Sequence, residues 1–119
     1  MARVVAFIPD LLFGSNVLGA LTSAGHETVL VSDQAGLQRE LPGADALLVD
    51  LTADAGERIG LLAATPHDRV KALAFYSHVE VDVRAQAEEA GFDLVIPRSR
   101  MAREGAALVT RLVGSSATG

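Results

Sequence analysis

The stretch Ala46-Leu47-Leu48-Val49-Asp50 decides the fold, because four apolar residues follow one another with no polar residue between them. A strand with one face in water alternates apolar and polar residues, whereas a strand buried on both faces reads as an unbroken apolar run. Similar runs recur along the chain. The sequence therefore predicts five buried strands, over residues 4–8, 28–31, 46–49, 72–76 and 94–96.

Between these runs, hydrophobic residues recur with the spacing of a helix. Val17, Leu18, Leu21 and Ala24 form one stripe, which ends at Gly25, a residue that readily adopts the left-handed conformation found where helices stop. The same spacing predicts further helices over residues 34–40, 55–64, 81–90 and 100–113.

Strands and helices that alternate five times predict a single α/β domain over residues 1–113, followed by a flexible tail over residues 114–119. Parallel strands joined by right-handed helical crossovers form a sheet with helices on both faces. We expect a flavodoxin-like (βα)₅ sandwich of three layers, with a five-stranded parallel sheet in the order 2-1-3-4-5.

The polar residues of interest follow the predicted strands. In open parallel sheets, ligands bind beyond the carboxyl ends of the strands, an edge that we call the rim. Nearly all of the candidate residues lie on this rim: Asp10, Ser32, Asp33, Asp50, Thr52, Ser77, His78, Arg98 and Ser99.

Composition excludes several classes of function. The chain has 119 residues and no cysteine, which excludes disulfides, thiolate catalysis and cysteine-bound metals. Its net charge of −5 argues against nucleic acid or an anionic membrane as a partner, because both attract basic surfaces. No apolar stretch approaches the roughly 20 residues needed to cross a bilayer. We expect a cytoplasmic protein.

With Asp50 after the third strand, Ser77 after the fourth and Arg98 after the fifth, the chain resembles the receiver domain of response regulators, the CheY-like family, over roughly residues 3–113. The resemblance implies that Asp50 is the acceptor of a phosphoryl group and that the Ser77 hydroxyl detects it. It also implies that Asp10 and Asp50 bind Mg²⁺, and that Arg98 stands near the position of the family's lysine.

Two departures from the receiver pattern favour a pseudo-receiver without efficient phosphotransfer. Receivers carry an acidic pair after the first strand, where Ile8-Pro9-Asp10 offers a single carboxylate. Arg98 in place of the family's lysine also replaces a compact ammonium group with a planar guanidinium. We expect a stand-alone signalling domain, not an enzyme, that binds a protein partner, or a second copy, through the last helices and the fifth strand.

Each rim residue also has a plainly structural interpretation. Asp50 is a suitable cap for the helix that follows it, and Ser99 for the last helix. Asp10 fits a turn, and Ser77 is a common residue at a strand exit. Arg98 has Glu104 or Asp50 as prospective partners.

A second resemblance, to dinucleotide-binding Rossmann domains, involves Gly14, Ser15 and Asp33. Asp33 ends the second strand, where an acidic residue binds ribose in that family. The fingerprint G-x-G-x-x-G is broken, because its first two glycines would fall at Pro9 and Leu11. A phosphate or nucleotide bound at Gly14 and Ser15 is the alternative function, unless Ser15 or Asn16 simply caps the first helix.

The histidines offer no metal site, because no two have ligand spacing. His26 follows a turn and is expected to be exposed. His78 adjoins Ser77 on the rim, but neighbouring residues of an extended segment point to opposite sides, so a Ser-His-Asp triad is not expected.

Overall fold

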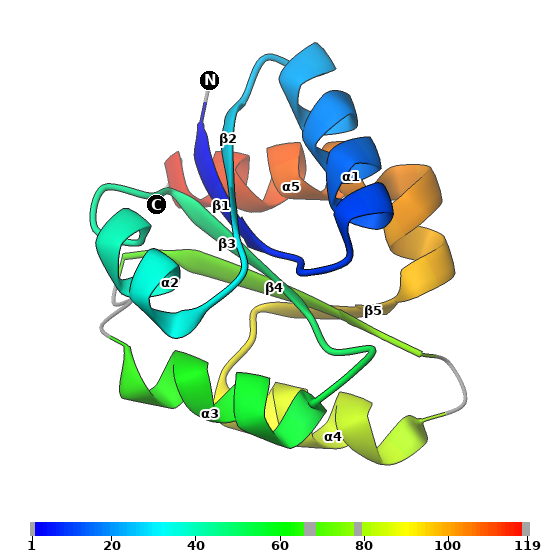
Figure 1. Cartoon of the computed structure of the whole chain (residues 1–119). Helices are drawn as coiled ribbons and strands as arrows, with labels where there is room; N and C mark the ends of the chain where they lie inside the picture. The colour runs from blue at the N-terminus through cyan, green and yellow to red at the C-terminus, as the bar shows by residue number, and fades with distance from the viewer. Residues whose placement is uncertain (1, 66–68, 78–79, 118–119) are drawn as a thin grey trace.

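The computed structural model describes residues 2–65, 69–77 and 80–117 (Figure 1). The five predicted strands are confirmed, each with bounds within a residue of the prediction. The predicted helices over residues 34–40, 55–64 and 81–90 have the bounds of α2, α3 and α4. In chain order the elements are β1 (Arg3–Phe7), α1 (Leu11–Ser23), β2 (Glu27–Val31), α2 (Gln34–Glu40), β3 (Ala46–Asp50), α3 (Ala55–Ala64), β4 (Lys71–Tyr76), α4 (Val81–Ala90), β5 (Leu94–Pro97) and α5 (Arg98–Ala117).

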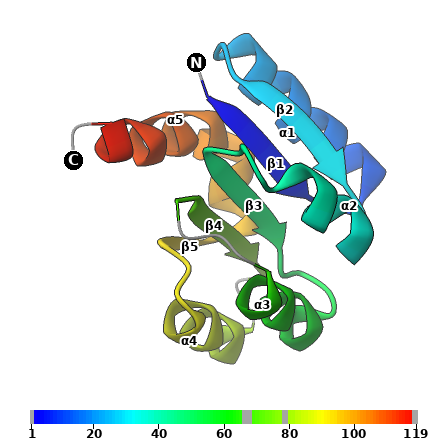
Figure 2. The same ribbon diagram turned by 90° about the vertical axis from the view of Figure 1, so that its left-hand side faces the viewer.

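The five strands form one parallel sheet in the order β2-β1-β3-β4-β5, which confirms the predicted topology. Helices α1 and α5 cover one face of the sheet, and α2, α3 and α4 cover the other (Figures 1 and 2). Because all pairs are parallel, every strand ends at the same edge. The rim is therefore a real feature of the molecule.

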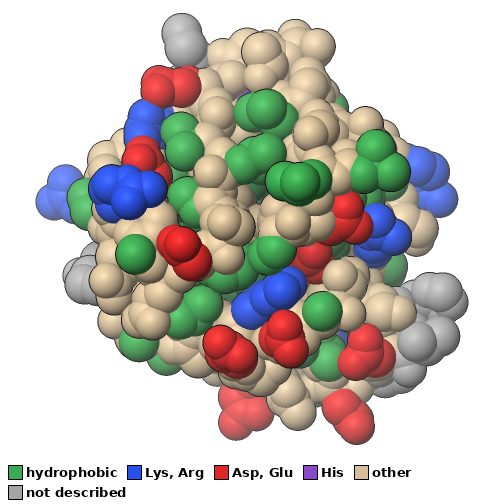
Figure 3. Space-filling model, viewed as in Figure 1, with side chains coloured by type: hydrophobic (Ala, Val, Ile, Leu, Met, Phe, Trp, Pro, Cys, Tyr) green, Lys and Arg blue, Asp and Glu red, His purple; other side chains and the backbone are tan. Residues whose placement is uncertain are grey.

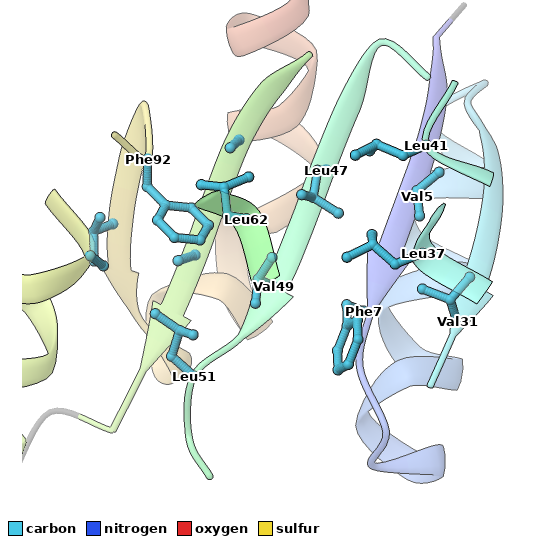
Figure 4. Close-up of a cluster of buried hydrophobic side chains, with 14 of the residues drawn as sticks. Val5, Phe7, Val31, Leu37, Leu41, Leu47, Val49, Leu51, Leu62 and Phe92 are labelled. Carbon is cyan, nitrogen blue, oxygen red and sulfur yellow. The ribbon is translucent and has the colours of Figure 1, made fainter. Parts of the chain in front are cut away.

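Two hydrophobic cores lie on opposite faces of the sheet. Leu47 belongs to the core beneath α2, α3 and α4, which also contains Leu62 and Phe92 (Figure 4). Leu48 belongs to the core beneath α1 and α5. Both leucines are fully buried. Successive side chains of a strand point to opposite faces, so a strand between two cores must be apolar at every position.

Helix α1 begins at Leu11, and the side chain of Asp10 caps it by accepting the backbone N–H of Phe13 at 3.1 Å. The prediction that Ser15 or Asn16 caps this helix is wrong, since Asp10 satisfies the free N–H groups one turn earlier. The predicted stop at Gly25 is confirmed. This glycine has a φ of 94°, and the N–H of the next residue returns to the carbonyl of Leu21 at 3.0 Å.

Helix α5 is longer than predicted at both ends, running from Arg98 to Ala117. Ser99 therefore lies within the first turn and does not precede it as a cap. The tail that was expected to be flexible is helical as far as Ala117. Each residue added to an existing helix gains one backbone hydrogen bond, and Gly or Ser in place of Ala lowers helix stability by less than about 1 kcal/mol. Among the described residues, no helix has both the length and the apolar character to cross a membrane.

His26 is buried, contrary to the expectation that it is exposed. Its Nδ1 accepts the N–H of Ala2 at 3.2 Å, and its Nε2 lies 2.8 Å from the hydroxyl of Thr110. That hydroxyl donates to the carbonyl of Ala106, so it accepts from the Nε2–H of a neutral imidazole. His26 thus connects the start of β1 to α5, through contacts that are remote in sequence.

Substitution of a buried leucine and of an exposed leucine tests the position of the core. Leu48→Ala should lower the free energy of unfolding by about 2–5 kcal/mol, because it opens a cavity in a site with no exposed surface. Leu12→Ala should change it by less than about 0.5 kcal/mol, since Leu12 is 76% exposed. Urea titration followed by circular dichroism measures both, and equal effects would contradict the described packing.

Candidate functional site

The rim has a depression of about 660 Å³ above the ends of β4 and β5. Four of the predicted rim residues line it, namely Thr52, Ser77, Arg98 and Ser99, together with Phe13, Asn16, Glu80 and Ala102. Residues that are distant in sequence therefore converge at one mouth of the sheet. The predicted His78 lies outside the described residues, as does His67.

Asp50 ends β3 and is only 4% exposed. Its Oδ1 accepts the backbone N–H of Thr52 at 2.8 Å and also the Thr52 hydroxyl. These bonds close a turn within the loop that follows β3. Asp50 does not cap α3, because the residue at that position is Asp54, whose side chain makes no capping bond. The carboxylate of Asp50 therefore stabilises its own loop.

Arg58, on α3, is the residue that the sequence analysis missed. Its Nη1 donates to the backbone carbonyl of Asp50 at 2.8 Å and lies 4.0 Å from the Asp50 carboxylate. Its Nη2 lies 3.8 Å from the carboxylate of Asp54. The guanidinium also stacks above Phe7, at 5.6 Å from the ring centre, and its side chain is only 12% exposed. The Arg58 guanidinium therefore supplies a positive charge next to Asp50 from within the same chain.

A signal for Arg58 does exist in the sequence. It precedes Leu61 and Leu62 by three and four residues, which places a charge on the side of α3 that faces the sheet. A charge on a buried face needs a partner. Asp54 lies one helical turn before Arg58, within reach of its side chain, and adopts the left-handed conformation, with a φ of 50°.

Asp10 and Arg98 form the second ion pair of the rim. Oδ1 of Asp10 caps α1, and Oδ2 lies 3.6 Å from Nη2 of Arg98. The guanidinium of Arg98 also lies above the ring of Phe13, at 4.3 Å from its centre. Arg98 thus pairs with neither Glu104 nor Asp50, the two partners considered from sequence. Glu104 instead pairs with Arg100 at 3.4 Å.

The two predicted Mg²⁺ ligands do not fit that ion well. Asp10 and Asp50 each face an arginine, and each already accepts a backbone N–H. Within the described part of the chain, no three Asp, Glu or His side chains gather as metal ligands. Mg²⁺ needs oxygen ligands in octahedral geometry, and a guanidinium beside a carboxylate competes with it.

The residues of the dinucleotide alternative do not form one site. Asp33 lies in a separate depression of about 320 Å³, with Arg58 and Asp54, and caps α2 by accepting the N–H of Gly36 at 2.7 Å. Gly14 is buried where a Cβ would come within 3.3 Å of the Ile8 carbonyl oxygen, so it allows α1 to approach the end of β1. Ser15 is exposed.

No family model and no curated protein matches this chain, but many solved structures share its fold. NtrX from Brucella abortus, crystallised with ADP, is 16% identical with a TM-score of 0.86; the match covers 98% of this chain and 27% of NtrX. A response regulator from Thermotoga maritima is 18% identical with a TM-score of 0.79, over 96% and 98% of the two chains.

The receiver domain of a sensor histidine kinase from Pseudomonas aeruginosa is 18% identical with a TM-score of 0.76, over 95% of this chain and 98% of its own. That domain has a magnesium ion in its active-site cleft. At such low identity the likeness concerns the fold. The resemblance inferred from the sequence is thereby confirmed at that level: this chain has the receiver fold.

The Arg58 contacts generate a stability prediction. Arg58→Gln should lower the free energy of unfolding by about 2 kcal/mol, because it removes a charged hydrogen bond and leaves the Asp50 carboxylate without its cation. Arg84→Gln is the control, since Arg84 is half-exposed on α4 and pairs with Glu88 at 3.8 Å. It should cost less than about 0.5 kcal/mol.

Urea unfolding of both variants, together with Asp50→Asn and the double variant, measures these values. The effects of Asp50→Asn and Arg58→Gln should be non-additive, because the two residues are in contact. Additive effects, or equal losses in Arg58→Gln and Arg84→Gln, would show that the pair contributes nothing specific.

Proposed function

We propose that this protein is a pseudo-receiver, a receiver-fold signalling domain that acts by binding a protein partner without efficient phosphotransfer. One observation carries the proposal: the carboxylate at the end of β3, Asp50, is buried and engaged by Thr52 and Arg58. A carboxylate that attacks a phosphoryl group needs a free oxygen and cations that hold the incoming phosphate.

The electrostatics of the rim support this proposal. The cation nearest Asp50 is Arg58, which belongs to the adjoining helix and is held by Asp54, the Asp50 carbonyl and the ring of Phe7. A phosphoryl group on Asp50 would have to displace the Thr52 hydrogen bonds from Oδ1 or approach Oδ2 on the side of Arg58. Breaking contacts to a buried charged group is costly. We infer that the loop after β3 keeps one conformation.

The surface formed by α4, β5 and α5 is where we propose that the partner binds. A depression of about 300 Å³ there has an apolar floor of Leu94, Leu108 and Leu112, with Asp93, Arg100 and Arg111 around it. Apolar anchors surrounded by charged residues are typical of protein interfaces. The exposed face of α4 adds Asp82, Arg84, Glu88 and Glu89.

Phosphotransfer is tested directly with acetyl phosphate and Mg²⁺. Intact-mass spectrometry should show no added phosphoryl group on the wild-type protein, whereas an active receiver in the same assay gains one. Titration with Mg²⁺ should leave the Thr52 amide signal unchanged. A stoichiometric phosphoryl adduct that Asp50→Asn abolishes would overturn the pseudo-receiver proposal and make Asp50 an acceptor.

The partner surface is tested by affinity capture from the cells that express the protein. A specific partner should bind the wild type and Arg39→Glu, because Arg39 is 69% exposed on α2, which follows β2 at the opposite edge of the sheet from β5. Binding should fall at least tenfold in Arg100→Glu, which reverses a charge beside the apolar floor and removes the Arg100–Glu104 pair. Loss of binding in Arg39→Glu alone would contradict this location.

A further inference from the structure

The two edges of the sheet differ in how they are protected. Edge strands tend to pair with other chains, and proteins protect them with short length, proline or charged residues. β5 has four residues and ends at Pro97, next to Arg98. β2 has five residues and no proline, and its one charge, Glu27, lies at its first position. The β2 edge therefore lacks the usual protection.

The backbone groups that β2 presents outward follow from its register. The N–H of Glu27 donates to the carbonyl of Ala2 at 2.9 Å, so the backbone groups of Glu27 face β1. In a parallel pair, alternate residues of a strand bond to the same neighbour. Val29 and Val31 therefore also face β1, whereas the N–H and C=O groups of Thr28 and Leu30 face away from the sheet.

On the side of α1, the surface beside β2 is apolar and uncharged. Helix α1, which packs next to β2, contains no charged residue, and its first two residues, Leu11 and Leu12, are 80% and 76% exposed. Figure 3 shows hydrophobic side chains gathered over α1. Such a surface is unusual for a helix that faces water.

We infer that β2 binds β2 of a second copy of this chain, in an antiparallel pair that joins the two sheets into one. Thr28 would lie opposite Leu30 of the partner subunit, and each such pair would exchange both of its backbone hydrogen bonds. Val29 would lie on the two-fold axis. Helix α1 of each copy would then lie on the same face of the joined sheet, on either side of the axis.

The charge pattern of β2 fits this self-pairing. Like charges directly opposite each other destabilise a sheet, but Glu27 would face Val31 of the partner subunit. Glu27 is moreover neutralised within its own chain by Arg3, at 2.6 Å. The strand is thus self-complementary, in contrast to the β5 edge, where proline removes an N–H donor.

A stable dimer needs only a modest share of the chain's surface. A standard interface takes about 800 Å² from each partner, and the whole chain exposes 6279 Å². Roughly an eighth of the surface is therefore needed. Of the 13 residues of α1, eight are exposed and can contribute to this area.

Hydrogen exchange and sedimentation test the inference on the wild-type protein. Sedimentation velocity should show the mass rising from monomer to dimer with concentration. Over the same range, exchange of the Thr28 and Leu30 amides, measured by NMR, should slow at least tenfold, while the Val29 and Val31 amides stay protected throughout. A protein that stays monomeric, or exchange at Thr28 and Leu30 that does not change with concentration, would overturn the inference.

Thr28 also offers a matched pair of variants. Thr28→Pro removes an outward N–H and no bond to β1, and the Thr28 hydroxyl is buried without a hydrogen-bond partner, so its loss costs no bond. This variant should be monomeric, whereas Thr28→Val should dimerise like the wild type. A dimer that survives in folded Thr28→Pro would place the interface elsewhere. If Thr28→Pro does not fold, the hydrogen-exchange measurement on the wild-type protein decides whether β2 forms the interface.

Discussion

The constraint on which this structure depends is the burial of a parallel sheet on both faces. β3 lies between two cores, so Leu47 and Leu48 are both fully buried although they point in opposite directions. Polar groups are costly at such positions. They are therefore displaced to the strand ends, and since the strands are parallel, those ends form one rim. The fold creates the candidate site by gathering polar residues at the ends of the strands.

At that rim, on a receiver fold, each of the two carboxylates is paired with an arginine. Two arginines hold the two carboxylates, Arg58 with Asp50 and Arg98 with Asp10. Each guanidinium also lies above an aromatic ring, Phe7 in the first case and Phe13 in the second. The negative charge of the two carboxylates is thus balanced from within the chain, which is the electrostatic basis of the pseudo-receiver proposal.

Much of the site followed from strand ends alone. Thr52, Ser77, Arg98 and Ser99 line one depression, as their positions after three different strands predicted. The partners of these residues were harder to predict. Asp10 was considered as a turn residue, yet it caps α1 and pairs with Arg98, because α1 and α5 pack side by side on one face of the sheet. The buried contacts of His26 with Ala2 and Thr110 were missed for the same reason.

The strands, most helix bounds and the order of the sheet could be predicted from the residues, because they depend on local periodicity and on the general handedness of crossovers. Which charges meet, and so which carboxylates are free, depends on how the chain folds. Ion pairing requires the positions of atoms far apart in the chain, to within a few ångströms. Arg58 shows the difference: its periodicity placed it on a buried face, but only the folded loop after β3 brought Asp50 to it.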